Sequence, residues 1–185
     1  IGEVIITSII VNRSFTGKIP KEEITDDIAS THNIKYNRSD KKFVIVIPSY
    51  KNSKWCEKNI LSTTNQYYRN YRVIFTDDCS PDDTFEKVSA IVNKSINKDK
   101  FTLIKNTVRV GALENLYNMI YSCADDEIIL TLDGDDWLAN NNVLNVLNMH
   151  YSMSEVWMTY GQYQNYPDGG IGVASKIPEH IIASN

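Results

Sequence analysis

The run Phe43-Val-Ile-Val-Ile47 decides the fold class of this 185-residue chain. It is continuously apolar and mostly β-branched, which predicts a strand that is buried on both faces. Pro48 is expected to end this strand. Outward from it, strand-like and helix-like segments alternate along the chain. This alternation predicts an α/β fold with a mostly parallel sheet and helices on both of its faces.

The remaining elements follow from periodicity and from helix-start signals. Further strands are expected at 71–76, 101–104, 127–132 and 156–163. Helices are expected at 55–67, after residue 80, around 113–120 and at 142–151. The third of these helices rests on the i, i+3, i+4, i+7 spacing of Leu113, Leu116, Tyr117 and Ile120.

Two serines mark the expected helix starts. Ser53 is the expected N-cap of the first helix. The segment Ser80-Pro81-Asp82-Asp83 combines an N-cap serine, a first-turn proline and a carboxylate at the third helical position. We therefore expect the second helix to begin at Ser80.

The chain divides by character into two parts. Residues 1–42 contain a β-like run, Val4–Val11, followed by a polar stretch, and we interpret them as an N-terminal extension. Residues 43–185 are expected to form one domain around a single core. Because the chain begins at Ile1 rather than Met and ends without a stop-like feature, we expect it to be part of a longer protein, truncated at its C-terminus.

Composition excludes several classes of protein. A net charge of −4 argues against a nucleic-acid partner, because phosphate-backbone readers gather basic residues. No apolar run approaches the roughly 20 residues that span a bilayer, so no membrane span is expected. Cys56, Cys79 and Cys123 form no CxxC pair, which argues against a disulfide framework or a zinc site. We therefore expect a cytoplasmic location.

Polar residues follow three of the predicted strands. Pro48-Ser49-Tyr50 comes after the first strand, Asp77-Asp78 after the second, and Asp133-Gly-Asp-Asp136 after the fourth. In open parallel sheets, ligands bind outside the carboxyl ends of the strands. The spacing therefore predicts that these residues share one pocket.

The segment Asp133-Gly-Asp-Asp136 concentrates carboxylates at a strand end, where their repulsion is costly unless a cation offsets it. Such oxygen ligands select Mg²⁺ or Mn²⁺, which proteins hold with one or two carboxylates plus substrate phosphates. The alternative is a solvated acidic turn. The preceding apolar strand and the following Trp137-Leu138 favour the metal site, and the spacing is not that of an EF-hand.

Single residues leave two interpretations open. Asp77 and Asp78 are either helix-flanking charges or acceptors for a nucleobase imide N–H, and Asp78 is the better candidate. Tyr50 either packs on the first helix or offers its ring to a base. Arg109 is either a solvated charge or a partner for a diphosphate.

Three segments, in order, resemble the signature blocks of inverting glycosyltransferase family 2: Phe43 to Tyr50, Val73 to Thr84 and Ile128 to Trp137. The resemblance implies a GT-A fold and a nucleoside-diphosphate sugar donor, expected to be UDP-linked, with transfer to an unknown glycan, protein or lipid acceptor. It implies the following roles: Pro48 and Tyr50 at the base, Asp78 on its imide, Asp133 near the ribose, and Asp135 on the metal with Asp136 as a second ligand. Ser49, Asp77, Arg109 and Gly134 complete the predicted donor-binding set.

The chain also departs from the family pattern. Lys51 stands where the family usually has Asn, and Cys79 where it often has Gly. The family's catalytic base lies well downstream of the metal motif, so we expect it beyond Asn185. A nucleotidyltransferase and a non-catalytic carbohydrate- or protein-binding module are the alternative functions.

Overall fold

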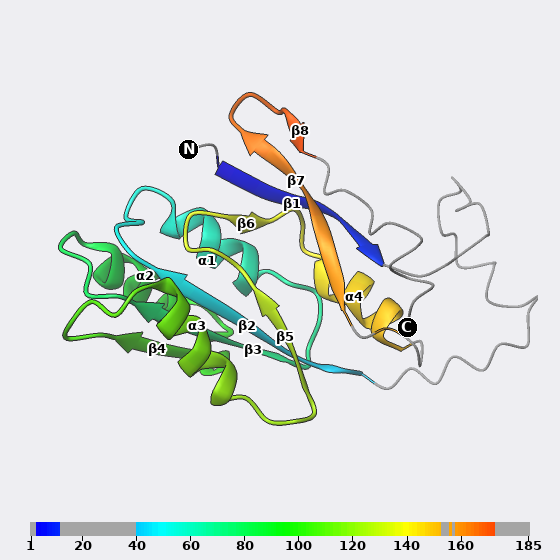
Figure 1. Ribbon diagram of the computed structural model, residues 1–185, viewed down its shortest axis with the longest axis horizontal. Coiled ribbons are helices and arrows are strands. Elements are labelled where there is room, and N and C mark those ends of the chain that lie inside the picture. The colour runs from blue at the N-terminus through cyan, green and yellow to red at the C-terminus, as the bar shows by residue number, and fades with distance from the viewer. Residues whose placement is uncertain (1–2, 12–39, 153–155, 157, 173–185) are drawn as a thin grey trace, which may run out of the picture.

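The computed structural model describes residues 3–11, 40–152, 156 and 158–172 (Figure 1). Its main sheet has the strand order β4-β3-β2-β5, and all neighbouring pairs are parallel. The strands are β2 (Lys42–Ser49), β3 (Tyr71–Asp77), β4 (Phe101–Lys105) and β5 (Glu127–Thr131). The predicted parallel sheet is confirmed. Strand order reverses between β2 and β5, which is where such sheets bind ligands.

The central strand β2 is buried on both faces, as its sequence predicts. Phe43, Ile45 and Ile47 point into one apolar cluster, and Val44 and Val46 point into another. None of the five side chains is more than 1% exposed. Because residues alternate between the faces of a strand, this continuous apolar run requires helices on both sides of the sheet.

Helices cover both faces of the sheet (Figure 1). The larger cluster receives side chains from three helices: α1 (Cys56–Thr64), α2 (Thr84–Lys94) and α4 (Val143–Tyr151). The opposite face is covered by α3 (Ala112–Tyr121), which contributes Met119. A short 3-10 turn, η2 (Lys98–Lys100), leads from α2 into β4. Within the described residues, no helix is long and apolar enough to cross a membrane.

A second sheet has the order β6-β1-β7-β8. The strand β1 (Glu3–Val11) runs parallel to β6 (Trp137–Leu138) and antiparallel to β7 (Thr159–Tyr166), which also pairs with β8 (Ile171–Gly172). The β-like run of the N-terminal segment is therefore a strand. The division of the chain at residue 42 stays a prediction, and 12–39 and 173–185 lie outside the described residues.

Aromatic rings join α1 to this second sheet. The rings of Trp55 and Trp137 stack with centroids 6.2 Å apart, and Tyr166 meets both edge-on. The Lys58 ammonium lies 3.5 Å from the centre of the Tyr166 ring and 4.7 Å from that of Trp137. Cation–π attraction therefore adds to the packing of this cluster.

The first strand continues past Pro48 to Ser49, so the expectation that Pro48 ends it was wrong. The Leu132 N–H donates to the Val46 carbonyl, which shows that alternate β2 residues face β5. The backbone of Pro48, like that of Val46, faces the β5 side of the strand. However, β5 ends at Thr131, before it reaches the level of Pro48. A proline is tolerated there because no ladder bond needs its missing N–H.

Both predicted helix caps were wrong, because the two serines bond elsewhere. The Ser53 hydroxyl donates to Asp83 and accepts from the Lys87 ammonium, and α1 starts at Cys56 without a side-chain cap. The Ser80 hydroxyl accepts the Lys51 N–H at 3.0 Å. α2 starts only at Thr84, whose N–H donates to Asp82.

The amphipathic spacing located α3 correctly, but of its four positions only Leu116 packs against the apolar cluster on the sheet. Leu113 is 82% exposed and Tyr117 is 55% exposed, whereas Asn115 and Met119 are buried. The Asn115 amide donates to the Gly111 carbonyl and accepts from the Asn106 side chain. This polar anchor turns the helix so that Met119, rather than Tyr117, meets the sheet.

Candidate functional site

A cavity of about 250 Å³ lies at the carboxyl ends of the main-sheet strands. Its lining consists of Pro48, Ser49, Tyr50, Asn52, Asp78, Arg109, Ala112, Asn115, Asp133, Gly134 and Asp135. The predicted shared pocket is therefore present, with Asp77 and Asp136 outside its lining. Two larger hollows, of about 450 and 500 Å³, lie along β5 and beside Asn140, away from these polar residues.

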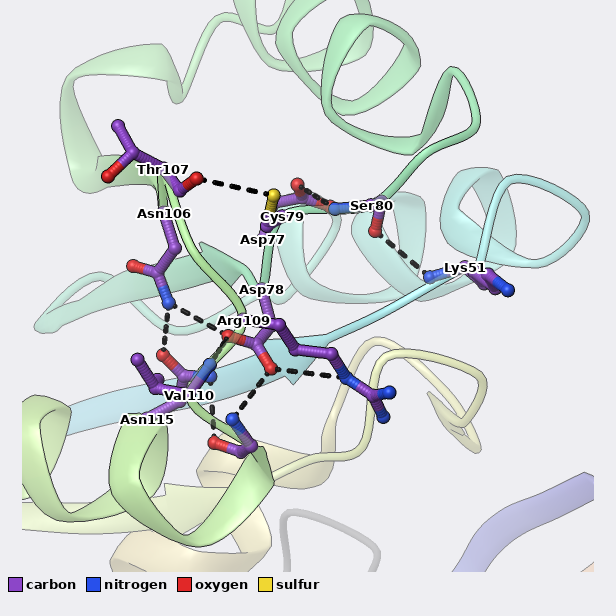
Figure 2. A network of polar contacts seen from close by, with 11 residues as sticks. Lys51, Asp77, Asp78, Cys79, Ser80, Asn106, Thr107, Arg109, Val110 and Asn115 are labelled. Atoms are coloured by element: carbon purple, nitrogen blue, oxygen red, sulfur yellow. Dashed lines mark hydrogen bonds and ion pairs between the residues drawn. The ribbon is translucent and has the colours of Figure 1, made fainter.

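Asp78 follows the last residue of β3 and is held by a network of donors (Figure 2). Its carboxylate accepts the N–H of Val110 at 2.9 Å, the N–H of Gly111 at 2.8 Å and the side-chain amide of Asn106 at 3.0 Å. Burial alone would raise its pKa, but these hydrogen bonds, led by that from Val110, lower the pKa to about 2. The group is thus an anion that ties the loop before α3 to the end of β3.

This network leaves limited room for a ligand at Asp78. A carboxylate offers about four acceptor positions, and three of them have the protein donors above. The Asn115 side chain also helps to lower the pKa of Asp78, and the Arg109 Nε lies 3.8 Å away. The predicted bond from a nucleobase imide would have to compete with these groups.

Asp77 is fully buried and faces the loop rather than the cavity. One carboxylate oxygen accepts the Ser80 N–H at 3.0 Å, and the other has no hydrogen-bond partner among the described residues. Its contacts shape the turn that follows β3.

Tyr50 and Arg109 lie against each other at the mouth of the cavity. The guanidinium carbon of Arg109 is 3.9 Å from the centre of the Tyr50 ring, and its Nε is 3.8 Å from the Asp78 carboxylate. The Arg109 side chain is 62% exposed. Arg109 thus bridges the aromatic ring and the buried anion while most of its surface remains open to solvent.

The acidic turn approaches β2 closely at Gly134. A Cβ atom at this position would lie 2.7 Å from the Ser49 hydroxyl oxygen and 2.8 Å from the Ser49 Cβ, which is closer than real contacts allow. The turn is closed by a bond of 3.1 Å from the Asp136 N–H to the Asp133 carbonyl. Glycine therefore permits the turn to sit on the end of the strand.

The carboxylates of the turn suit a hard divalent cation. Burial and, to a lesser extent, the charge of Asp135 raise the pKa of Asp133. A cation would remove the cost of holding these two charges together. Among the described residues no group of three or more ligating side chains is placed to hold a metal ion. Asp133 and Asp135 both line the cavity, and one or two carboxylates are the number that proteins typically supply to Mg²⁺.

The two departures from the family pattern occupy strained backbone. Lys51 and Cys79 have φ values of 58° and 59°, in the left-handed region. Glycine and asparagine adopt this conformation at the least cost, which explains why they suit these positions. The Lys51 N–H donates to the Ser80 hydroxyl, and the Cys79 thiol donates to the Thr107 carbonyl (Figure 2). The loops thus keep a glycine-like shape without glycine.

Sequence reasoning missed Asn52, Ala112 and Asn115 in the lining, and Asn106 behind it. Side-chain amides in loops carry no periodic signal. Asn115 lies off the apolar spacing of α3, as the exposed Asn118 does, so its sequence position did not reveal its burial.

Solved structures share the fold at low sequence identity. TarS of Staphylococcus aureus in complex with UDP superposes with a TM-score of 0.51 at 23% identity, covering 58% of this chain and 31% of that one. The Pyrobaculum calidifontis mannosyltransferase PcManGT, solved with GDP-Man and Mn²⁺, gives a TM-score of 0.53 at 20% identity, covering 60% and 33%. The predicted GT-A type of α/β fold is confirmed.

Sequence relatives are closer. An uncharacterized glycosyltransferase of Haemophilus influenzae is 32% identical over 119 residues, which are 64% of this chain and 46% of that protein. The Escherichia coli protein WfaP, named a UDP-Glc:alpha-D-GlcNAc-diphosphoundecaprenol beta-1,3-glucosyltransferase, is 31% identical over 137 residues, 73% and 51%. The chain spans about half the length of these relatives.

A family match covers most of the described site. The Glycosyl transferase family 2 profile matches residues 44–167, a range that runs from β2 past the acidic turn to the end of β7. Because the match includes more than half of the chain and the cavity lining, the chain belongs to glycosyl transferase family 2.

Proposed function

We propose that this chain binds the donor of a metal-dependent glycosyltransferase, which moves a sugar from a UDP-sugar to an acceptor hydroxyl with inversion. The observation that carries the proposal is the convergence of Tyr50, Asp78, Asp133 and Asp135 on one cavity at the switch point of the sheet. Family membership favours glycosyl transfer over a nucleotidyltransferase or a non-catalytic binding module.

The cavity has two chemically different ends. Tyr50, Arg109 and Asp78 offer a ring, a cation and a buried anion, which suit a nucleobase and a neighbouring phosphate. At the other end, the Asp133 carboxylate can accept hydrogen bonds from the ribose hydroxyls, and Asp135 can bind Mn²⁺ or Mg²⁺. Asp136 is a second candidate metal ligand. A nucleoside diphosphate would span both ends.

UDP is proposed as the carrier on the strength of relatives. WfaP is named for UDP-Glc, and the TarS neighbour was solved with UDP. PcManGT was solved with GDP-Man, so GDP is the proper competitor in any test.

The proposed chemistry is assigned to the chain's own groups as follows. Asp135 would hold the cation, which when bound neutralises charge that develops on the leaving diphosphate. Arg109 would orient the diphosphate, and Asp78 and Tyr50 would orient the base. No described residue is assigned as the base that deprotonates the acceptor hydroxyl.

Calorimetric titration of UDP into the chain with and without Mn²⁺ tests this proposal. The wild type should bind UDP with Mn²⁺, more tightly than GDP, and Asp135→Asn should remove the gain due to the metal. Asp125→Asn is a matched control because Asp125 is an exposed carboxylate away from the cavity. Absence of UDP binding by the wild type, or equal metal gain in Asp135→Asn, would overturn it.

A further inference from the structure

Three polar side chains along α1 and its C-terminal end bind the segment that carries the acidic turn. Asn59, Ser62 and Gln66 are spaced three and four residues apart, so they share one face of the helix. The Ser62 hydroxyl accepts the Leu138 N–H at 3.0 Å. The Gln66 side chain donates to the Asn140 carbonyl at 2.8 Å and accepts from the N–H of Leu144.

Asn59 makes the contact nearest to the carboxylates. Its side-chain amide donates to the Asp133 carbonyl at 2.9 Å and to the Asp136 carbonyl at 2.7 Å. Asn59 is fully buried. One amide group thus holds both ends of the acidic turn.

These bonds fix the turn in position on α1. Asp133 and Asp136 are also joined by the N–H to carbonyl bond that closes the turn. With the backbone of both residues held by Asn59, the Asp135 side chain between them lines the cavity. Metal ligands that are held by surrounding hydrogen bonds bind their ion without the entropic cost of first ordering the backbone.

We propose that Asn59 is a positioning residue for the divalent cation: its amide holds the acidic turn in the shape that presents Asp135 to the metal. The inference rests on the proposed function. Asn59 itself touches neither metal nor donor, because it lies outside the cavity lining.

Removal of the amide has a clear physical effect. In Asn59→Leu the side chain keeps similar bulk, but the two carbonyls lose their buried donor. The turn then gains alternative conformations in which the mutually repelling Asp133 and Asp135 carboxylates separate. Loss of such supporting bonds typically weakens metal affinity by about 10- to 100-fold.

The test measures metal binding directly. Mn²⁺ is titrated into the chain with saturating UDP, and the electron paramagnetic resonance signal of free Mn²⁺ reports the unbound ion. Asn59→Leu should weaken Mn²⁺ binding at least about tenfold. Uridine, which lacks phosphates and needs no metal, should lose much less affinity than Mn²⁺ does in ligand-observed NMR, because only its ribose would reach the acidic turn.

Two further variants separate positioning from packing. Asn97→Leu is the matched control, because the Asn97 amide donates to the Thr64 carbonyl at the far end of α1. It should lower the melting temperature and leave Mn²⁺ affinity unchanged. Asn59→Ser keeps one donor on a shorter side chain, so it should bind Mn²⁺ more weakly than the wild type and more tightly than Asn59→Leu. If Asn59→Leu does not fold, the comparison of Asn59→Ser with the wild type tests the proposal.

The outcomes distinguish the two proposals. A wild type that binds no Mn²⁺ in the presence of UDP contradicts the proposed function. A wild type that binds Mn²⁺, alongside folded Asn59 variants of unchanged affinity, contradicts only the role of Asn59.

Discussion

The Arg109 guanidinium covers the Tyr50 ring at 3.9 Å, on the aromatic group that the sequence assigned to a nucleobase. A base that stacks on this face must displace the arginine. The arginine then becomes available to the diphosphate, which is the role predicted for it. Arg109 thus contacts both the Tyr50 ring and the Asp78 carboxylate, at the end of the cavity proposed for the base.

This contact predicts opposite effects on two ligands. Arg109→Ala should bind uridine a few-fold more tightly, because an exposed cation–π contact worth about 0.5–1 kcal/mol no longer competes. The same variant should bind UDP more weakly, because the diphosphate loses its cation. Lys94→Ala is the control, because Lys94 is an exposed cation in the last turn of α2 and lies outside the cavity lining. Parallel changes for uridine and UDP would contradict the displacement.

The Asp78 network predicts a dependence of stability on pH. The pKa of Asp78 is about 2 in the folded protein, below the ordinary value of 3.8, so the folded state favours the anion. The resulting stabilisation of about 2 kcal/mol is complete above the unfolded pKa and is lost as pH falls towards 2. Urea unfolding of the wild type and Asp78→Asn from pH 7 to pH 3 measures it. The difference between them should shrink as pH falls, and a constant difference would refute this origin.

Close approach at Gly134 predicts a steric effect on metal binding. The Cβ of Gly134→Ala would overlap Ser49 and push the acidic turn from β2, with a cost in stability of about 1–3 kcal/mol. Mn²⁺ affinity should fall as well. Gly170→Ala is the control, because its nearest contact would be an ordinary 3.5 Å. Unchanged melting temperature and Mn²⁺ affinity in Gly134→Ala would show that the turn adapts freely.

The left-handed backbone at Cys79 predicts that glycine at this position stabilises the fold relative to alanine. Cys79→Ala removes the thiol contact with Thr107 but keeps the strain at φ 59°. Cys79→Gly also removes the strain, so it should be more stable than Cys79→Ala by about 1 kcal/mol in thermal or urea unfolding. Equal stability of the two variants would mean that the loop relaxes around either residue.

Elements whose sequence signal reflects their own burial could be predicted. The apolar run of β2 predicted that both faces of this strand are buried. The positions of Tyr50, Asp78 and Asp135 after strand ends predicted that they line one cavity. These inferences need only the alternation of strands and helices and the common direction of parallel strands.

Features that depend on tertiary hydrogen bonds could not be predicted. Ser53 and Ser80 have the composition of helix caps, but other parts of the fold use their hydroxyls. Asn59 and Asn115 sit at helix positions that a polarity pattern assigns to solvent, and both are buried because they bond to distant groups. No local pattern announces such partners.

The ring cluster of Trp55, Trp137 and Tyr166 follows directly from the acidic turn, because Trp137 is the residue after Asp136. Two of the three tryptophans in the chain therefore belong to a ring cluster that begins one residue after the acidic turn and includes the Lys58 ammonium. Indole emission responds to nearby charge and to ring contacts. Loading of the acidic turn is therefore expected to be visible as a change in the protein's own fluorescence, without any attached dye.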